Sequence, residues 1–154
     1  MSIRLRFVGE SAPFAKLIRF WTWDSKFSHV EFVFTEGYLG ARPISGVRVR
    51  PFDYIKPKYQ AFATVTLEDS FEDSKMTQSV ETFARSQIGK PYDYLGIVGF
   101  VIKHDFNDTH RWFCSALIAE AFEQAGCPLL DLNQLDRISP RDLTLSERVK
   151  FDSN

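Results

Sequence analysis

Two side chains in this sequence, a cysteine and a histidine, are suited to nucleophilic chemistry. Cys114 stands at the start of a predicted helix over 113–125, where unpaired N–H groups and the helix dipole favour a thiolate. A cysteine hydrolase needs such a thiolate, a base that takes its proton, and a group that orients the base. The alternative interpretation of Cys114 is a small core residue, because free cysteines are often buried.

His29 is the histidine that its surroundings should hold most rigidly, since it lies in an apolar, β-rich segment over 27–34. A hydrogen-bonded core histidine is the alternative. Glu31 follows two residues later, and residues i and i+2 of a strand share a face, so its carboxylate can hold the imidazole. The alternative for this carboxylate is a structural salt bridge to Arg42, Arg48 or Arg50.

The other candidate ligands and nucleophiles carry weaker signals. His104 and His110 fall in a polar segment and are expected to be solvated, although a helix extended back to His110 would place it on the face of Cys114. Cys127 lies at the C-terminal end of the same predicted helix and is expected to be structural. Thirteen positions of helix separate the two cysteines by about 20 Å, well beyond the ~7 Å that a disulfide spans.

Length and composition limit the classes of protein to consider. The chain has 154 residues, which suits one domain over 1–154, and its formal net charge of -1 gives no support to nucleic-acid binding. Aromatic residues make up 15%, which suggests a dense core or an apolar groove. We find no signal peptide and no apolar run of ~18 residues, so we expect no stable membrane insertion. A cytoplasmic protein, or one delivered by a phage or another route without a signal, is the expectation.

The pattern of hydrophobic residues predicts strands in the first half and helices in the second, which is typical of an α+β fold. Predicted strands cover 3–8, 27–34, 38–41, 46–50 and 61–67, and predicted helices cover 14–23, from Asp73 or Ser74 to 88, and 113–125. The segment over 95–102 is a buried helix or a strand. Ser139-Pro140-Arg141-Asp142 has the pattern of a helix start with a capping box.

Taken in order, four short motifs resemble a known family. They are Ser28-His29-Val30, Gly89-Lys90-Pro91-Tyr92-Asp93, Phe113-Cys114-Ser115-Ala116-Leu117-Ile118 and Ser139-Pro140-Arg141-Asp142-Leu143. Together they resemble the circularly permuted branch of the NlpC-type papain-like cysteine hydrolases. This branch includes YiiX-like and YaeF-like proteins and, more distantly, lecithin:retinol acyltransferase-like enzymes. The histidine stands 85 residues before the cysteine, which is the permuted order, and the resemblance runs from about Phe14 to Ser146.

The resemblance implies roles for the matching positions. Cys114 would be the nucleophile, His29 the base, and Tyr92 the neighbour of the thiolate or a donor to the oxyanion. The family usually takes its third polar residue from the strand after the histidine, but the matching segment over 38–41 has no suitable side chain, so Glu31 is our substitute, with Arg42 or a backbone carbonyl as fallback. The expected substrate-binding residues are Ser28, Asp93, Trp112 and Ser115.

These implications give a function to test. We expect a permuted papain-like fold with a central antiparallel sheet and packed helices, the nucleophile at a helix N-terminus, and no metal or cofactor. The expected activity is cleavage of an amide in a peptide or peptidoglycan-like substrate through an acyl-enzyme.

Alternatives are a lipid acyl hydrolase or acyltransferase and a non-catalytic binding module. A metal-binding module is less favoured. The lipid alternative would use an apolar groove bordered by Trp21, Trp23, Phe27 and Trp112, and the metal alternative would use His29, His110 and Cys114. The oligomeric state is left open.

Overall fold

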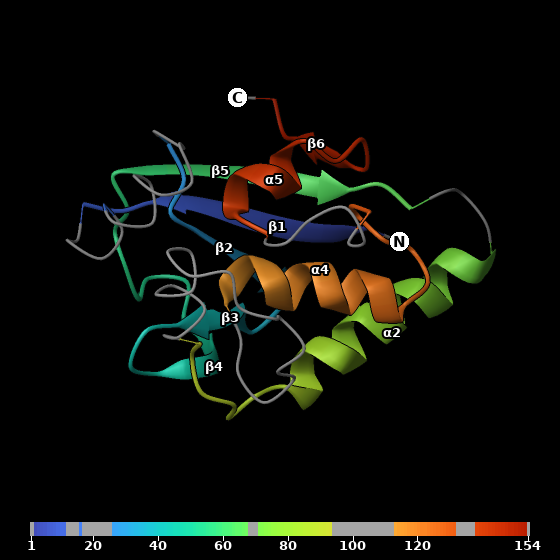
Figure 1. Cartoon of the computed structure of the whole chain (residues 1–154), viewed down its shortest axis with the longest axis horizontal. Coiled ribbons are helices and arrows are strands. Elements are labelled where there is room, and N and C mark those ends of the chain that lie inside the picture. Colours follow the sequence, from blue (N-terminus) through green and yellow to red (C-terminus); the bar gives the residue numbers. More distant parts are fainter. Residues whose placement is uncertain are drawn as a thin grey trace.

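The fold is given by a computed structural model, which describes residues 2–11, 16, 26–67, 71–93, 113–131 and 138–153, without the side chains of 71–73. The predicted helix over 14–23, apart from residue 16, and the segment over 95–102 lie outside the described residues. Strands and helices follow in the expected order (Figure 1). The elements are β1 (Ile3–Gly9), β2 (His29–Phe34), β3 (Gly37–Arg42), β4 (Gly46–Arg50), β5 (Tyr59–Val65), α2 (Phe71–Ser86), α4 (Cys114–Gln124), α5 (Pro140–Thr144) and β6 (Val149–Phe151).

Six strands form an antiparallel sheet in the order β4-β3-β2-β1-β5-β6, which confirms the predicted α+β fold. β1 and β2 occupy the middle of this sheet, and their register sets Arg6 opposite Glu31 and Phe7 opposite Val30. Because side chains alternate along a strand, this register sorts polar and apolar residues onto different faces. The two central strands therefore carry both the core of the fold and its buried charges.

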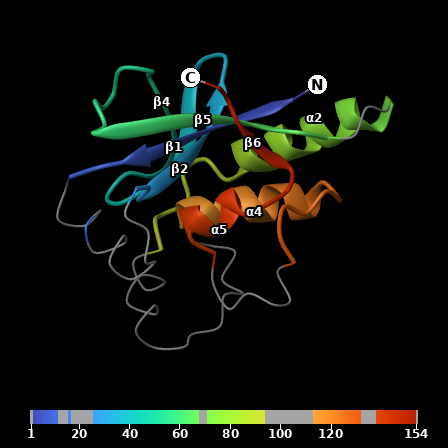
Figure 2. The same cartoon turned by 90° about the horizontal axis from the view of Figure 1, so that it is seen from above.

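One face of the sheet is apolar and is covered by helices. Phe32 of β2 packs on Phe122 of α4 with 6.4 Å between ring centroids, and Val80 of α2 is buried in the same core. Figure 2 shows α2 and α4 on the same side of the sheet. Burial of these side chains is the main source of stability in such a layer. In the part of the chain that the structure describes, no helix has the length and apolar character needed to cross a membrane.

The other face of the two central strands carries polar side chains that are buried near its middle. Arg6, His29 and Glu31 all lie on this face, and each is buried. A buried charge is costly unless a hydrogen-bonded partner of opposite charge offsets its lost hydration. The contacts of these three side chains therefore decide whether this face is a structural salt bridge or a chemical site.

Helix α4 begins at the cysteine, as predicted. Phe113 has an extended backbone with φ -87° and ψ 150°, so this residue caps the helix and Cys114 is its first residue. His110, considered for a face shared with Cys114, lies outside the described residues. The Phe113 side chain makes no capping hydrogen bond, which leaves the first-turn N–H groups of the helix free of a side-chain cap. The helix ends before Gly126, whose φ of 75° suits a glycine terminator.

Three of the remaining elements show what local patterns can and cannot predict. Ser139 and Asp142 form the predicted capping box of α5, with the Asp142 N–H donating to Ser139 Oγ at 3.3 Å. α2 begins at Phe71, a few residues before the predicted caps Asp73 and Ser74, so this predicted boundary is wrong. β6 was not predicted, since three residues are too short for an alternating pattern to be recognised.

Candidate active site

His29 and Glu31 meet as the sequence predicted. Both side chains extend from the same face of β2, and His29 Nε2 lies 3.1 Å from Glu31 Oε2. A carboxylate accepts hydrogen bonds only, so the neutral imidazole carries its proton on Nε2 and keeps its lone pair on Nδ1. This arrangement orients the imidazole and leaves Nδ1 as the nitrogen that can take a proton.

Glu31 is held by two further donors that sequence analysis missed. Arg6 NH1 donates to Glu31 Oε1 at 3.1 Å, and the Tyr54 hydroxyl donates to Glu31 Oε2 at 2.7 Å. The alternative ion-pair partners Arg42, Arg48 and Arg50 are thus wrong, because the arginine directly opposite Glu31 and paired with it comes from β1 and not from β3 or β4. Burial alone would raise the pKa of Glu31, but hydrogen bonds from His29 and Tyr54 lower it overall.

Arg42 links this cluster to the surface. Its Nε donates to the Tyr54 hydroxyl at 2.7 Å, and its NH2 pairs with Glu10, which follows β1. Burial, followed by the positive charge of Arg42, lowers the pKa of His29, and the hydrogen bond to Glu31 opposes this shift. The lowered pKa favours a neutral imidazole at neutral pH. Arg42, expected as a fallback orienting residue, instead acts on His29 by its charge and through Tyr54.

Cys114 lies close to the start of β2, beside the residue that follows His29. The thiol is 1% exposed, and hydrogen bonding from the backbone of Val30 and Ser115 stabilises its anion. Burial outweighs these contacts and the helix N-terminus, and it raises the pKa of Cys114 to about 11. The expected thiolate is therefore a neutral thiol in this structure. His29 and Cys114 are both described, and no hydrogen bond joins them.

The loop that carries Tyr92 is fixed to β4. The Val47 N–H donates to the Lys90 carbonyl at 2.9 Å, and the Gly89 N–H donates to the Val47 carbonyl at 2.9 Å. Gly46 permits this docking, because a Cβ there would lie 2.3 Å from the Lys90 oxygen. Tyr92 is buried, and its ring centroid lies 5.9 Å from that of Phe113. Tyr92 is therefore next to the residue that precedes the cysteine, and its place beside the thiolate, which the resemblance implies, stays a prediction.

The expected substrate-binding residues have mixed outcomes. Ser28 Oγ accepts from the Glu10 N–H at 3.3 Å, and Ser115 Oγ donates to the Ile138 carbonyl at 2.5 Å. Both hydroxyls are buried and fasten neighbouring segments, so the structure gives each a structural contact. Asp93 is half-buried at the end of the Tyr92 loop, and Trp112 lies outside the described residues.

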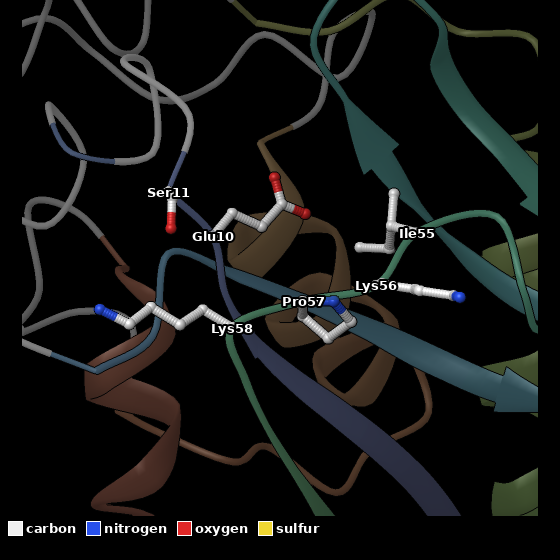
Figure 3. Close-up of a pocket in the computed structure, with 6 residues that line it drawn as sticks. All are labelled: Glu10, Ser11, Ile55, Lys56, Pro57 and Lys58. Carbon is white, nitrogen blue, oxygen red and sulfur yellow. The ribbon is translucent and has the colours of Figure 1, made fainter.

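A pocket of about 390 Å³ lies beside this cluster, lined by Glu10, Ser11, Ile55, Lys56, Pro57 and Lys58. Glu10 connects it to the buried site through its ion pair with Arg42. Figure 3 shows the two lysine side chains extending to opposite sides of Pro57, so they do not converge on one anion site. The chemistry of the region therefore centres on the buried carboxylate and not on the lysines of the pocket.

The position of the third residue is explained by a glycine on the neighbouring strand. A Cβ added at Gly40 of β3 would lie 2.9 Å from Glu31 Cβ, a distance at which one of them must move. We expect Gly40→Ala to cost about 1–3 kcal/mol of unfolding free energy, as overpacking does, and to displace the Glu31 carboxylate from His29. Urea denaturation measures the first effect. Unchanged stability together with an unchanged titration of His29 would contradict this explanation.

The comparisons with known proteins bear on the family and on the fold. Residues 14–147 match the family model of the permuted papain-like amidase enzymes, YaeF/YiiX, C92 family. The chain belongs to the C92 family. Among solved structures, the metalloprotein yiiX of Escherichia coli O157:H7 is similar, with a TM-score of 0.69 and 14% identity over 99% of this chain and 96% of that chain. A comparison with curated proteins gave no match. The C92 match confirms the expected permuted papain-like family and a cysteine hydrolase of the amidase type.

The described residues of this C92 chain do not fit a metal centre. No three His, Cys, Asp or Glu side chains gather as ligands among them. His29 and Glu31 are bonded to each other, and Arg6 and Arg42 place positive charge beside them, which opposes a bound cation. The metal implied by the name of yiiX thus has no counterpart in the described site, and we derive no step through a metal.

The raised pKa of Cys114 predicts slow alkylation. At pH 8 the thiolate fraction of a group with a pKa of about 11 is on the order of 100-fold below that of a free thiol, so iodoacetamide should react correspondingly slowly. Peptide mass spectrometry follows Cys114 and Cys127 separately, and glutathione is the reference thiol. Rapid alkylation of Cys114 with a midpoint at or below ~8.5 would show a thiolate instead.

The same shift predicts a loss of stability at alkaline pH. The folded state retains the Cys114 proton up to about pH 11, whereas the unfolded chain releases it near ~8.5. The unfolded state therefore binds fewer protons in this interval, and the free energy of unfolding should fall as pH rises through it. Urea denaturation of wild type and Cys114→Ala between pH 8 and 10 isolates this contribution, and parallel curves would contradict it.

Proposed function

We propose that this C92 amidase cleaves an amide bond in a peptide-like substrate, including peptides of the peptidoglycan type, through a Cys114 acyl-enzyme. The observation that carries the proposal is the His29–Glu31 contact of 3.1 Å on β2, with the Cys114 thiol beside the backbone of Val30, which lies between these two residues. A carboxylate-oriented imidazole next to a thiol at a helix N-terminus is the arrangement that activates a cysteine nucleophile.

In the first half of the reaction, His29 Nδ1 takes the thiol proton as Sγ attacks the carbonyl carbon. The resting thiol and imidazole are both neutral, so proton transfer accompanies the attack and does not precede it. The hydrogen bond between His29 and Cys114 would form in the substrate complex, since catalytic hydrogen bonds of free enzymes are often long and tighten when substrate binds.

In the second half, the imidazolium returns its proton to the leaving amine as the C–N bond breaks, and a thioester remains on Cys114. Water then attacks the thioester while His29 takes its proton, and the thiol leaves protonated. Glu31 stabilises the imidazolium in both halves. The backbone N–H of Cys114, in the first turn of α4, is our candidate donor to the oxyanion, with Tyr92 as the second.

The test is product analysis with three substrate classes: muropeptides, N-acyl dipeptide amides and phospholipid vesicles. We expect a free amine from the first or second class, and a wild-type acyl-enzyme that mass spectrometry maps to Cys114. Cys114→Ala should remove both signals. Cys127→Ala is the matched control, since Cys127 is a second buried cysteine, beyond the opposite end of α4.

Each other outcome has a defined meaning. Release of fatty acid without amine would replace the amidase by a lipid acyl hydrolase. Turnover that persists in Cys114→Ala would exclude the thiol as nucleophile. If all three substrate classes stay intact and no acyl-enzyme forms, the amidase proposal fails and the protein is a binding module that retained the fold.

A further inference from the structure

Tyr54 makes a short hydrogen bond to the carboxylate that orients the candidate base. It lies in the loop between β4 and β5, and its hydroxyl donates to Glu31 Oε2 at 2.7 Å. The same oxygen receives His29 Nε2 at 3.1 Å. Two donors thus share one carboxylate oxygen, so a change in one bond alters the strength of the other.

Arg42 fixes the tyrosine from the other side. Its Nε donates to the Tyr54 hydroxyl at 2.7 Å, and its guanidinium lies over the Tyr54 ring at 4.9 Å from the centroid. Because the hydroxyl accepts from Arg42, its own proton is directed to Glu31. Glu10 completes the series by pairing with Arg42 at the pocket of Figure 3.

We propose that Tyr54 is a positioning residue for the reaction. Arg42 and Glu10 hold Tyr54, and Tyr54 fixes the Glu31 carboxylate and weakens the hydrogen bond between this carboxylate and the His29 Nε2 proton. The proposal rests on the proposed function for its role in catalysis. Tyr54 is neither a nucleophile nor a base in it, and the hydroxyl acts only through Glu31.

The direction of the effect follows from the shared oxygen. A donated hydroxyl proton draws negative charge from Glu31 Oε2, so the carboxylate stabilises the imidazolium less. His29 then stays neutral at lower pH and remains available as a base. Burial, largest among the causes, and the Arg42 charge already lower the pKa of His29, and Tyr54 adds to them by restraining Glu31. Among the described residues, the charged and titratable groups near this pair are Arg6 from β1, Glu10 after β1, Arg42 from β3, Arg50 from β4, the Cys114 thiol of α4 and Tyr54 itself.

The test compares Tyr54→Phe with wild type by ¹⁵N NMR of the histidine rings over pH 4–8. The variant removes one oxygen and keeps the ring that packs beside Tyr38. We expect the His29 titration to move to higher pH and the acid limb of kcat/KM to move with it. We also expect kcat to fall roughly tenfold, because the Glu31 carboxylate loses one of the donors that fix it beside His29. Tyr59→Phe, the same chemical change at a half-exposed ring on β5, should do neither.

The NMR titration needs no substrate, so its outcome is separate from that of the proposed function. A His29 titration that superimposes on wild type in Tyr54→Phe would overturn the inference even if the enzyme is active. A shifted titration in a protein that cleaves none of the substrates would support the hydrogen-bond arrangement and reject only its catalytic use. Arg42→Met provides the second variant: it should also move the His29 titration to higher pH, since it removes both a lowering charge and the support of Tyr54.

Discussion

Glu31→Gln is expected to reduce kcat by about 10²–10⁴-fold while the thiol and the imidazole are both retained. The glutamine amide cannot offset the charge of the imidazolium that forms when His29 takes the Cys114 proton. The amide also carries N–H donors, which can turn towards Nε2 and favour the ring tautomer that lacks a proton there. His29 then no longer keeps its proton on Nε2 and its lone pair on Nδ1. Single-turnover kinetics with the substrate found by product analysis measures the effect on acylation.

The control for this prediction is Glu81→Gln on α2, which removes the same charge from an i,i+4 pair with Arg85. That carboxylate is exposed, so its loss should leave kcat unchanged and stability within about 0.5 kcal/mol. Acylation that survives Glu31→Gln at the wild-type rate would show that His29 is oriented by something other than this carboxylate.

Arg6→Met is expected to cost about 3–5 kcal/mol of unfolding free energy. Arg6 is 2% exposed and Glu31 is 0% exposed, so the substitution leaves a carboxylate buried without its counterion. Arg6 also donates to Gln60 Oε1 at 2.9 Å and lies 4.2 Å over the Tyr38 ring, and the variant loses these contacts as well. Urea denaturation at pH 7 measures the change.

Arg4→Met supplies a control on the same strand. Arg4 faces the same side of β1, but its ion pair with Asp152 is exposed, so we expect a cost below about 1 kcal/mol. The double variant Arg6→Met/Glu31→Leu should regain most of the lost stability, since apolar residues can replace a buried ion pair. It should remain inactive. An Arg6→Met cost as small as that of Arg4→Met would mean that the buried pair adds little to the fold.

The pH dependence of this pair has a definite sign. The pKa of Glu31 is lowered in the folded protein, so the unfolded chain binds its proton at a higher pH than the folded state does. Its contribution to stability is present above the unfolded value of ~4.3 and is lost as pH falls towards the folded one. Acid therefore weakens the fold and the candidate site together.

Most elements could be predicted from local sequence, because periodicity and capping are properties of neighbouring residues. The Ser139–Asp142 capping box follows from side chains within one helical turn, and the end of α4 follows from Gly126 just beyond it. The contact between His29 and Glu31 was also predictable, since it needs only the i, i+2 geometry of a strand. Four short motifs taken together indicated the papain-like family, and the histidine standing before the cysteine indicated its permuted branch.

The sequence by itself therefore determined the α+β class, the family and the pairing of the candidate base with Glu31. Only the tertiary structure decided that Arg6 and Tyr54 hold that carboxylate, because register across strands and the path of a loop join residues far apart in the chain. Only the structure, too, showed that Cys114 is a neutral thiol. A helix N-terminus is visible in a sequence, but the burial that outweighs it arises when distant segments pack together and remove the solvation of the anion.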